Sequence, residues 1–325
     1  MKNIKVFGLN SSKAFAESVC DYLDVPLSAH TEKYFPDKEP YIKSDTNVRG
    51  SDVYIIQSLY SDDNESVNDK FIKICFFIGS LRDASADRIT LVAPYLSFQR
   101  SDRKTESRAG ITTKYMPMML ESVGLDRILS MDVHNLSAFQ TGFRIPTDHL
   151  EAKNLTVDYI SKQIKDCHED ISVLSPDSGG TGRAERFRKA LATKLNRKVG
   201  LVHLDKIREG SIVHGTTISD DVKGKLVIAV DDMIASGSTL AKCEEAANKA
   251  GGILWAACAT HGLMVGEVNS FLSKLNRVII SDTIMQTRLS DEIKEKTTIL
   301  STSKLFARAI RRIHEDGGSI SDLLR

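Results

Sequence analysis

Short apolar runs that alternate with helical stretches are the feature that most constrains the fold of this chain. The apolar runs are rich in β-branched and aliphatic residues, and they occupy Ile4–Phe7, Val53–Gln57, Ile89–Pro94, Ile128–Val133, Ile171–Ser175, Leu201–Leu204, Leu226–Val230, Ile253–Ala259 and Val278–Ile280. Runs of this length are typical of parallel strands that are buried on both faces. Helix-period stretches separate them at Ser12–Leu23, Asn68–Leu81, Thr112–Val123, Glu151–Ile164, Arg183–Leu195 and Thr239–Ala250. This alternation predicts an α/β protein with mostly parallel sheets and right-handed crossovers.

The domain organisation follows from length and from one irregular stretch. At about 150 residues a domain, a chain of 325 residues predicts two domains. We place the boundary in the stretch 141–149, which contains Pro146, so that residues 1–148 form an N-terminal domain and residues 149–325 a C-terminal domain. A second irregular stretch, 208–225, is rich in Gly, Ser and Thr. It is either a mobile functional loop or a solvated hairpin, and the pattern alone favours neither.

Charge and composition argue against several classes of protein. Lys and Arg number 44 and Asp and Glu number 43, and a net charge of +1 gives no support for nucleic-acid binding. No apolar run reaches the roughly 18–20 residues that span a bilayer, and the chain begins with a strand-like pattern instead of a signal peptide. The five cysteines show no C-x-x-C spacing, which argues against structural zinc or a disulfide framework. We therefore expect a cytoplasmic protein with no nucleic-acid partner and no membrane partner.

The sharpest motif is a buried strand that ends in two acids and a turn of small residues. The apolar run 226–230 continues into Asp231 and Asp232, and the segment 236–239 then reads Ser-Gly-Ser-Thr at the start of a helix. Small residues let backbone amides approach an anion at a helix N-terminus, which suits a phosphate. The acids lie at the carboxyl end of a strand, where they can accept hydrogen bonds from sugar hydroxyls or hold a divalent metal. The alternative is an ordinary strand-to-helix turn with Asp232 near a cap.

Other polar motifs also follow predicted strands. A second glycine-rich turn, 175–183, carries Asp177 and strengthens the prediction of a phosphorylated ligand. His134 follows another strand, and it is either a metal ligand or a satisfied structural histidine. The segment 99–104 combines three cations with Asp102. Arginine forks suit polyphosphate oxygens, although most charge runs are solvated surface.

Lys206 and Arg208 stand at the start of the irregular stretch. In an extended segment, alternate residues place their side chains on one side. A loop that brings both cations over bound phosphates could stabilise charge in a transition state. The simpler interpretation is a solvated pair of surface cations.

Taken together and in order, these segments resemble the ribose-phosphate pyrophosphokinases, also called phosphoribosyl pyrophosphate synthetases. The resemblance covers almost the whole chain, and the ordered set is more specific than any one motif. The matching motifs are an early strand at Val48–Ser58, an adenine segment at Phe35–Glu39, an arginine-rich ATP segment at Tyr95–Lys104, a metal loop at Met131–His134, a Pro-Asp-x-Gly-Gly turn within Ser175–Gly180, the loop cations Lys206 and Arg208, a ribose-phosphate loop at Asp231–Thr239 and a C-terminus at Ala307–Leu324.

The resemblance implies an enzyme that transfers the β,γ-diphosphoryl group of Mg-ATP to the anomeric hydroxyl of ribose 5-phosphate. The products would be phosphoribosyl pyrophosphate and AMP. The implied fold is two similar phosphoribosyltransferase-type α/β domains with mostly parallel central sheets, with the active site between them and the terminal helix packed back on the N-terminal domain. The resemblance also implies a homo-oligomer based on dimers, for example a hexamer, in which a neighbouring subunit supplies adenine contacts.

The resemblance assigns roles to individual residues. It implies that ATP is bound by Phe35, Asp37, Glu39, Arg100 and Asp102. It implies that Mg²⁺ is placed by His134 and Asp177. The ribose 5-phosphate residues would be Asp231 and Asp232 at the hydroxyls, and Ser236, Gly237, Ser238 and Thr239 at the phosphate. Lys206 and Arg208 would be catalytic, because they would neutralise charge as the diphosphoryl group passes.

The chain departs from the family pattern at a few positions. Ala235 and Ser236 stand where the ribose-phosphate loop usually has an acid and a threonine, and Ser238 stands where glycine is usual. Ser101 replaces a usual glutamine, and Lys38 replaces a usual glycine. Two alternatives stay open. One is a phosphoribosyltransferase that uses phosphoribosyl pyrophosphate, which would not need the ATP segment. The other is a catalytically weak regulatory subunit, which Ala235 favours.

Overall fold

The computed structural model describes residues 3–177, 179–209, 212–315 and 317–324, and of these it gives only the backbone for 205–209 and 212–216. The chain divides into two units. The first comprises Met1–Glu151, Thr283–Met285 and Thr302–Arg325, and the second comprises Ala152–Asp282 and Gln286–Ser301. Each unit has a mostly parallel sheet with helices, so the predicted α/β class is confirmed. No helix in the described ranges has the length and apolar character needed to cross a membrane.

The first unit is built on a five-stranded parallel sheet with the order β1-β4-β5-β6-β7. Its strands are β1 (Ile4–Gly8), β4 (Asp52–Ile56), β5 (Arg88–Ala93), β6 (Arg127–Met131) and β7 (Thr147–Leu150). β4 is buried along its whole length, which explains the apolar residues that follow Asp52. β7 lies in the stretch where the sequence shows no regular pattern. Its pairing with β6 extends the first unit to Glu151.

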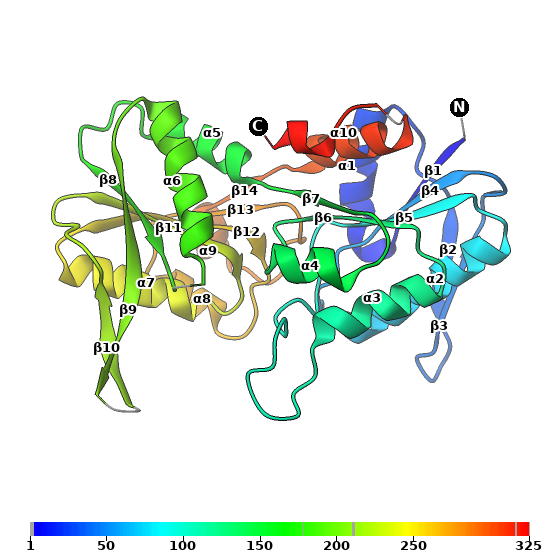
Figure 1. The fold of residues 1–325 in the computed structure, drawn as a ribbon, viewed down its shortest axis with the longest axis horizontal. Coiled ribbons are helices and arrows are strands. Elements are labelled where there is room, and N and C mark those ends of the chain that lie inside the picture. The colour runs from blue at the N-terminus through cyan, green and yellow to red at the C-terminus, as the bar shows by residue number, and fades with distance from the viewer. Residues whose placement is uncertain (1–2, 178, 210–211, 316, 325) are drawn as a thin grey trace. The chain divides into compact units, whose positions relative to one another are not determined.

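Helices cover both faces of this sheet (Figure 1). On one face lie α2 (Val67–Asp83), α3 (Thr112–Ser122) and α4 (Leu136–Gly142). On the other face lie α1 (Lys13–Leu23) and α10 (Ser303–His314), with the short 3-10 helices η1 (Asn10–Ser12) and η2 (Ile320–Leu323). α1 and α10 contact each other, and the rings of Phe15 and Phe306 meet edge to face at 5.5 Å. The C-terminal helix is therefore part of the first unit.

A buried aspartate ties α10 to this sheet. The Asp52 carboxylate is fully buried and accepts hydrogen bonds from Arg88 Nε at 2.8 Å and Nη2 at 2.6 Å. His314 Nδ1 lies 2.7 Å from the same carboxylate, and Arg88 Nη2 also donates to the carbonyl of Ile313 at 2.9 Å. Burial opposes ionisation of Asp52, but the hydrogen bonds from Arg88 and His314 outweigh it and lower the pKa of Asp52.

A small hairpin stands outside the main sheet of the first unit. It consists of β2 (His30–Tyr34) and β3 (Pro40–Ser44), which pair antiparallel. Lys73 of α2 is buried and forms an ion pair with Glu32 of β2 at 2.5 Å and another with Glu65. Removing one partner of a buried ion pair is strongly destabilising, so these charges hold the base of the hairpin on α2.

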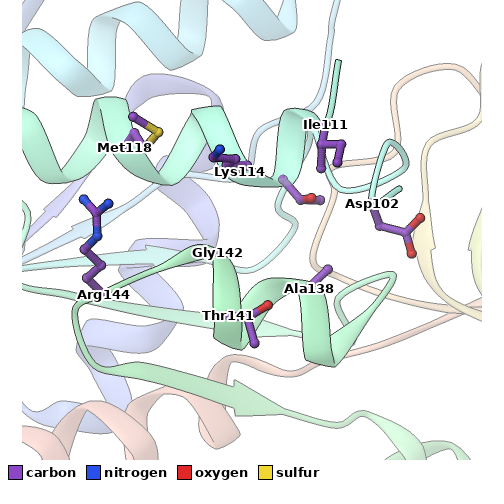
Figure 2. Close-up of a pocket in the computed structure, with 9 residues that line it drawn as sticks. Asp102, Ile111, Lys114, Met118, Ala138, Thr141, Gly142 and Arg144 are labelled. Carbon is purple, nitrogen blue, oxygen red and sulfur yellow. The ribbon is translucent and has the colours of Figure 1, made fainter. Parts of the chain in front are cut away.

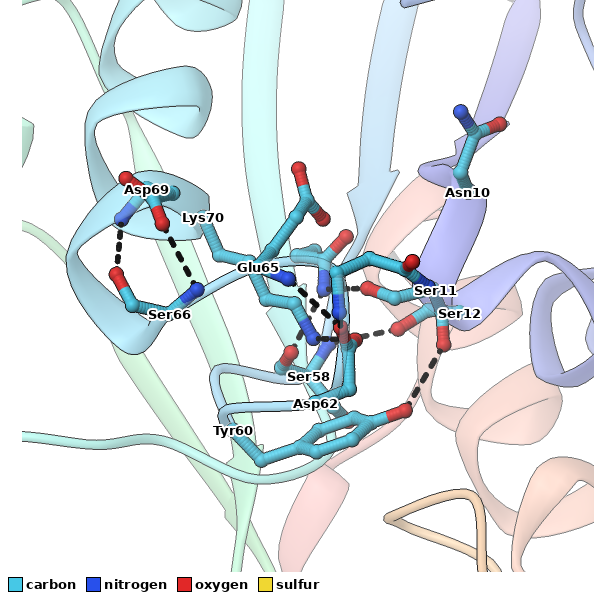
Figure 3. Close-up of polar contacts among 12 residues, drawn as sticks. Asn10, Ser11, Ser12, Ser58, Tyr60, Asp62, Glu65, Ser66, Asp69 and Lys70 are labelled. Atoms are coloured by element: carbon cyan, nitrogen blue, oxygen red, sulfur yellow. Dashed lines mark hydrogen bonds and ion pairs between the residues drawn. The ribbon is translucent and has the colours of Figure 1, made fainter. Parts of the chain in front are cut away.

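The loops that follow β1 and β4 close on each other through hydrogen bonds (Figure 3). The amide of Ser58 donates to Ser12 Oγ at 2.9 Å, and Tyr60 OH donates to the carbonyl of Ser11 at 3.3 Å. The polar groups at these strand ends therefore serve the fold of the first unit.

The second unit is built on a seven-stranded sheet with the order β10-β9-β8-β11-β12-β13-β14. β9 and β10 pair antiparallel, and the other neighbours pair parallel. The strands are β8 (Ile171–Ser175), β9 (Val199–Glu209), β10 (Ile212–Ile218), β11 (Leu226–Ile234), β12 (Ile253–Gly262), β13 (Val278–Ser281) and β14 (Thr297–Leu300).

Two apolar cores flank this sheet. One contains residues of α5 (Lys153–Gln163) and α6 (Thr181–Leu195), packed on side chains such as Val173 and Ile228. The other contains residues of α7 (Ser238–Lys249), α8 (Val268–Leu272) and α9 (Asp291–Glu295), packed on side chains such as Val227 and Ala229. Successive β11 residues alternate between the two cores, as expected for a strand covered on both faces.

Candidate functional site

The strand order of the second unit creates a switch point between β8 and β11. From β8 the chain passes through α6 to β9 on one side, and from β11 it passes through α7 to β12 on the other side. Open α/β sheets bind ligands outside the carboxyl ends of the strands at such a point. Asp177 lies two residues after the last residue of β8, and Asp231 and Asp232 lie near the end of β11. The sheet topology therefore gathers these predicted site residues.

The two acids lie within β11 and not in the turn after it. β11 pairs with β8 only as far as Ala229, but it pairs with β12 as far as Ile234, which keeps the acids in the strand. Asp232 is 3% exposed, and its amide donates to Asp231 Oδ1 at 2.8 Å. Burial, followed by the charge of Asp232, raises the pKa of Asp231 to about 7.

Arg183 contacts both acids, a role that the sequence analysis did not assign. Its Nη1 lies 3.3 Å from Asp231 Oδ1, and its Nη2 lies 3.5 Å from Asp232 Oδ2. Arg183 belongs to the first turn of α6, which starts beside the end of β11 because β8 and β11 are neighbours. One feature of the sequence could have indicated this contact: Arg183 is a cation that directly follows the glycine-rich turn after β8.

The predicted phosphate loop forms the start of α7. Gly237 has φ of 81°, a left-handed conformation that favours glycine, and a Cβ there would lie 3.2 Å from Leu272 Cδ2. Ser236 Oγ donates to Ser238 Oγ at 3.1 Å, so the two hydroxyls converge, and Thr239 is exposed. Hydroxyls beside the first amides of a helix are suitable donors for a phosphate.

The turn that carries Asp177 is fixed by its own hydrogen bonds. Asp177 Oδ1 accepts from the amide of Gly180 at 2.7 Å, and Ser175 Oγ donates to the carbonyl of Asp177 at 2.7 Å. A Cβ at Gly180 would lie 3.0 Å from Ser175 Oγ, so glycine suits this position. The Asp177 residue is exposed, whereas Ser178 of the same motif lies outside the described residues.

Lys206 and Arg208 lie on β9 of an antiparallel hairpin. Lys206 is opposite Thr216 and Arg208 is opposite Val213, with a register shift before Gly215. The described part of the stretch is thus a hairpin, one of the two forms that the pattern allowed. Lys206 and Arg208 are two residues apart on the same strand.

In the first unit, the predicted ATP segment is joined to the residue that follows the predicted metal loop. Asn135, which follows His134, donates from Nδ2 to Asp102 Oδ2 at 2.6 Å. Asn135 also caps α4, because its Oδ1 accepts from the amide of Ala138 at 3.2 Å. Burial opposes ionisation of Asp102, but the hydrogen bonds from Asn135 and Arg103 lower its pKa. Asn135 was not predicted as a site residue.

A groove of about 330 Å³ opens beside Asp102, between α3 and α4 (Figure 2). Asp102 lies at one end, Arg144 lies at the other, and Lys114 and Met118 of α3 face Thr141 of α4. The groove combines two cations with hydroxyl and apolar groups. Asp102 therefore lines a polar groove that is open to solvent. Arg100 and His134 are also exposed to solvent.

The predicted adenine residues lie at the tip of the β2–β3 hairpin. Phe35 is 46% exposed, and Asp37 and Glu39 are also exposed. The Phe35 ring meets Tyr41 edge to face at 6.1 Å, and the amide of Glu39 donates to Asp37 Oδ1 at 3.2 Å. In the described part of the chain, Phe35 contacts Tyr41 and Lys33, and Asp37 contacts Glu39, all within the hairpin.

The two predicted metal ligands lie in different units, His134 in the first and Asp177 in the second. Within the described ranges, no group of three or more His, Cys, Asp or Glu side chains could hold a metal ion.

Comparisons with protein families cover nearly the whole chain. The family described as "N-terminal domain of ribose phosphate pyrophosphokinase" matches residues 4–124. A "Phosphoribosyl transferase domain" matches residues 146–258, and a "Phosphoribosyl synthetase-associated domain" matches residues 205–325.

Individual relatives agree with these families. A ribose-phosphate pyrophosphokinase of Clostridium acetobutylicum is 36% identical over 318 residues, which are 97% of this chain and 95% of the relative. One of Agrobacterium fabrum is 35% identical over 317 residues, which are 96% of this chain and 97% of the relative. The crystal structure of phosphoribosylpyrophosphate synthetase from Mycobacterium smegmatis matches with a TM-score of 0.86 and 30% identity, covering 97% of this chain and 100% of that one.

Proposed function

The chain belongs to the ribose-phosphate pyrophosphokinase family, and from this premise we propose that it transfers the diphosphoryl group of ATP to ribose 5-phosphate. The anomeric hydroxyl of the sugar attacks the β-phosphorus and loses its proton. The bond from the β-phosphorus to the oxygen that bridges it to the α-phosphate breaks, and AMP leaves. The products are phosphoribosyl pyrophosphate and AMP. Such a reaction depends mainly on positioning and on charge neutralisation.

One observation carries the assignment of the ribose 5-phosphate site. The acid pair of β11 is followed directly by the small-residue start of α7, next to the switch point of the sheet. Asp231 and Asp232 accept hydrogen bonds from the ribose hydroxyls. The amides and hydroxyls of 236–239, which are Ser236, Gly237, Ser238 and Thr239, bind the 5-phosphate. Lys206 and Arg208 neutralise charge on the diphosphoryl group, an assignment supported by their place on the same strand, β9.

The first unit carries the ATP residues of this proposal. Arg100 and Asp102 bind the nucleotide, supported by the groove beside Asp102 and by the bond from Asn135 that fixes its carboxylate. The hairpin-tip residues Phe35, Asp37 and Glu39 contact adenine, supported by the exposed Phe35 ring. In this proposal the protein is a homo-oligomer based on dimers, and the hairpin tip of one subunit contacts the adenine bound to its neighbour. Light scattering can measure the oligomeric state.

We assign Mg²⁺ as the cofactor on the chemistry of the available donors. Magnesium prefers oxygen ligands, keeps several waters and is usually held by one or two carboxylates together with substrate phosphates. The exposed Asp177 fits this pattern, because one of its oxygens is engaged by Gly180 and the turn fixes its direction. His134 offers nitrogen, which magnesium accepts less readily than oxygen, so Asp177 is the better-supported ligand. When bound, the ion would neutralise phosphate charge.

The test is an assay of the purified full-length chain with ATP, ribose 5-phosphate and Mg²⁺, in which AMP and ADP are separated by anion-exchange chromatography. We expect AMP formation that requires the sugar phosphate and stops when EDTA is added. Release of ADP and phosphate would contradict diphosphoryl transfer. Absence of AMP, with consumption of phosphoribosyl pyrophosphate and a base, would identify a phosphoribosyltransferase. A chain that binds both substrates and forms no product would be a regulatory subunit.

A further inference from the structure

Arg183 is a cation that contacts both acids of β11. Its side chain is 23% exposed, and the two terminal nitrogens of its guanidinium are directed at different carboxylates. Neighbouring residues of a strand normally point to opposite faces. Here one planar group reaches both side chains, near the point where β11 extends beyond β8.

Two adjacent carboxylates with little access to water repel each other. Burial and the charge of Asp232 raise the pKa of Asp231, and the charge of Arg183 makes this rise smaller. A protonated carboxyl group has one oxygen that donates a hydrogen bond, so it is a poorer acceptor for a sugar hydroxyl. A cation that spans the pair therefore affects how well the pair can bind a diol.

We propose that Arg183 is a positioning residue for ribose 5-phosphate, which holds the carboxylates of Asp231 and Asp232 side by side and offsets their charge so that both accept hydrogen bonds from the sugar. This inference rests on the assignment of the acid pair to ribose in the proposed function. It goes further, because it explains how two neighbouring acids can act as one acceptor for vicinal hydroxyls. Arginine suits this role better than lysine, because its planar fork presents separate donors to two carboxylates.

The test uses three variants of the full chain. Arg183→Gln removes the cation, and Arg183→Lys keeps a charge without the fork. Lys189→Gln is the matched control, because Lys189 is a 68% exposed cation of the same helix that pairs only weakly with Glu185, at 3.4 Å. The apparent KM for ribose 5-phosphate, the apparent KM for ATP and kcat are measured from pH 6 to pH 9. Binding of ribose 5-phosphate to each variant is measured in parallel by titration calorimetry.

We expect Arg183→Gln to raise the KM and the Kd for ribose 5-phosphate at pH 7 by about tenfold or more, because hydrogen bonds to charged groups are strong. The KM for ATP should change less than about twofold. Without the cation Asp231 holds its proton to higher pH, so the pH at which ribose 5-phosphate binding improves should move upward. Arg183→Lys should shift this pH less but still weaken binding. Lys189→Gln should match the wild type, as expected for an exposed ion pair.

Several results would overturn the inference. If Arg183→Gln binds ribose 5-phosphate as the wild type does at every pH, Arg183 has no positioning role. If its main effect is on kcat or on the KM for ATP, Arg183 acts on the diphosphoryl group and not on the sugar. Should Arg183→Gln fail to fold by circular dichroism, Arg183→Lys decides the same question. A wild-type chain that forms no AMP would refute the proposed function alone, because calorimetry with ribose 5-phosphate still tests Arg183.

Discussion

Replacing Asp52 with asparagine tests how the C-terminal helix is held on the sheet of the first unit. The change keeps the size of the side chain and removes its charge. In the folded protein the carboxylate accepts two hydrogen bonds from Arg88 and lies 2.7 Å from His314 Nδ1. An amide nitrogen at this position would face the guanidinium as a second donor. The substitution therefore leaves Arg88 without its carboxylate and weakens the contact to α10.

The expected loss of stability follows from the burial of this group. Breaking a buried ion pair by removing one partner costs about 3–5 kcal/mol. Asp52 is 0% exposed, but the side chain of Arg88 is 23% exposed, so water can partly replace the lost carboxylate. We therefore expect the lower end, about 3 kcal/mol. For a unit of this size, each kcal/mol lowers Tm by about 2–4 °C, which gives a fall of about 6–12 °C.

The loss should also depend on pH. The folded pKa of Asp52 is lowered, so its contribution to stability is present above the unfolded pKa of about 3.9 and disappears as pH falls through the folded value. The difference in Tm between the wild type and Asp52→Asn should therefore have its largest value near pH 7 and become smaller as the pH falls below about 4. Asp322→Asn is the control, because Asp322 is 46% exposed and lies 3.9 Å from Arg312. Its Tm should stay within about 2 °C of the wild type.

Differential scanning calorimetry is the appropriate assay, because chains of two domains often unfold in more than one transition. Limited proteolysis at the C-terminus adds a second readout, since a weaker contact to α10 should expose it to cleavage. A shift below about 2 °C at pH 7 would refute the reasoning. So would a shift of full size that persists at pH 3, because then the lost energy does not come from the charge of Asp52.

The remaining predictions concern the proposed reaction. Asp231→Asn and Asp232→Asn should each raise the KM for ribose 5-phosphate by about tenfold or more and leave the KM for ATP nearly unchanged, since a hydrogen bond to a charged group is worth about 1.5–3 kcal/mol. Unchanged steady-state kinetics in both variants would mean that the acids serve only the fold. Lys206→Ala and Arg208→Ala should each lower kcat by about a hundredfold with little change in KM or Tm, because their contacts would form mainly in the transition state. A normal kcat in both variants would identify them as surface cations of the hairpin.

Apolar runs and helical periods were sufficient to predict most elements of the fold. Each predicted run overlaps a strand, and the predicted helix at Asn68–Leu81 corresponds to α2 at Val67–Asp83. Such strands are easy to predict because cores on both faces require apolar side chains throughout. The hairpin β2–β3 was not predicted as strands, because its stability comes from strand pairing and from a buried ion pair with α2 and not from an apolar run. β7 was also missed, since only its last residue is buried.

Candidate site residues could be predicted where a motif is local, and not where they depend on contacts between distant segments. The acids Asp231 and Asp232 and the turn after them were recognised from adjacent residues. The contact between Arg183 and Asp231 joins residues that are 48 positions apart in the sequence. The hydrogen bond from Asn135 to Asp102 joins residues that are 33 positions apart. Both arise because neighbouring strands bring their carboxyl ends together, and the order of the strands cannot be read from periodicity.

Ala235 is the strongest argument for a catalytically weak chain. The structure weakens this argument, because the loop keeps its conformation without an acid at this position. The carbonyl of Ala235 accepts a hydrogen bond from the amide of Val265 at 2.9 Å, so the loop backbone is held without any side chain at this position. An acid here would place a negative charge near the N-terminus of α7, where it would compete with a phosphate for the same amides. With alanine, the segment between Asp232 and α7 carries no charge, and the serine hydroxyls still converge at 3.1 Å. The substitution should therefore change how the phosphate is contacted more than whether it binds.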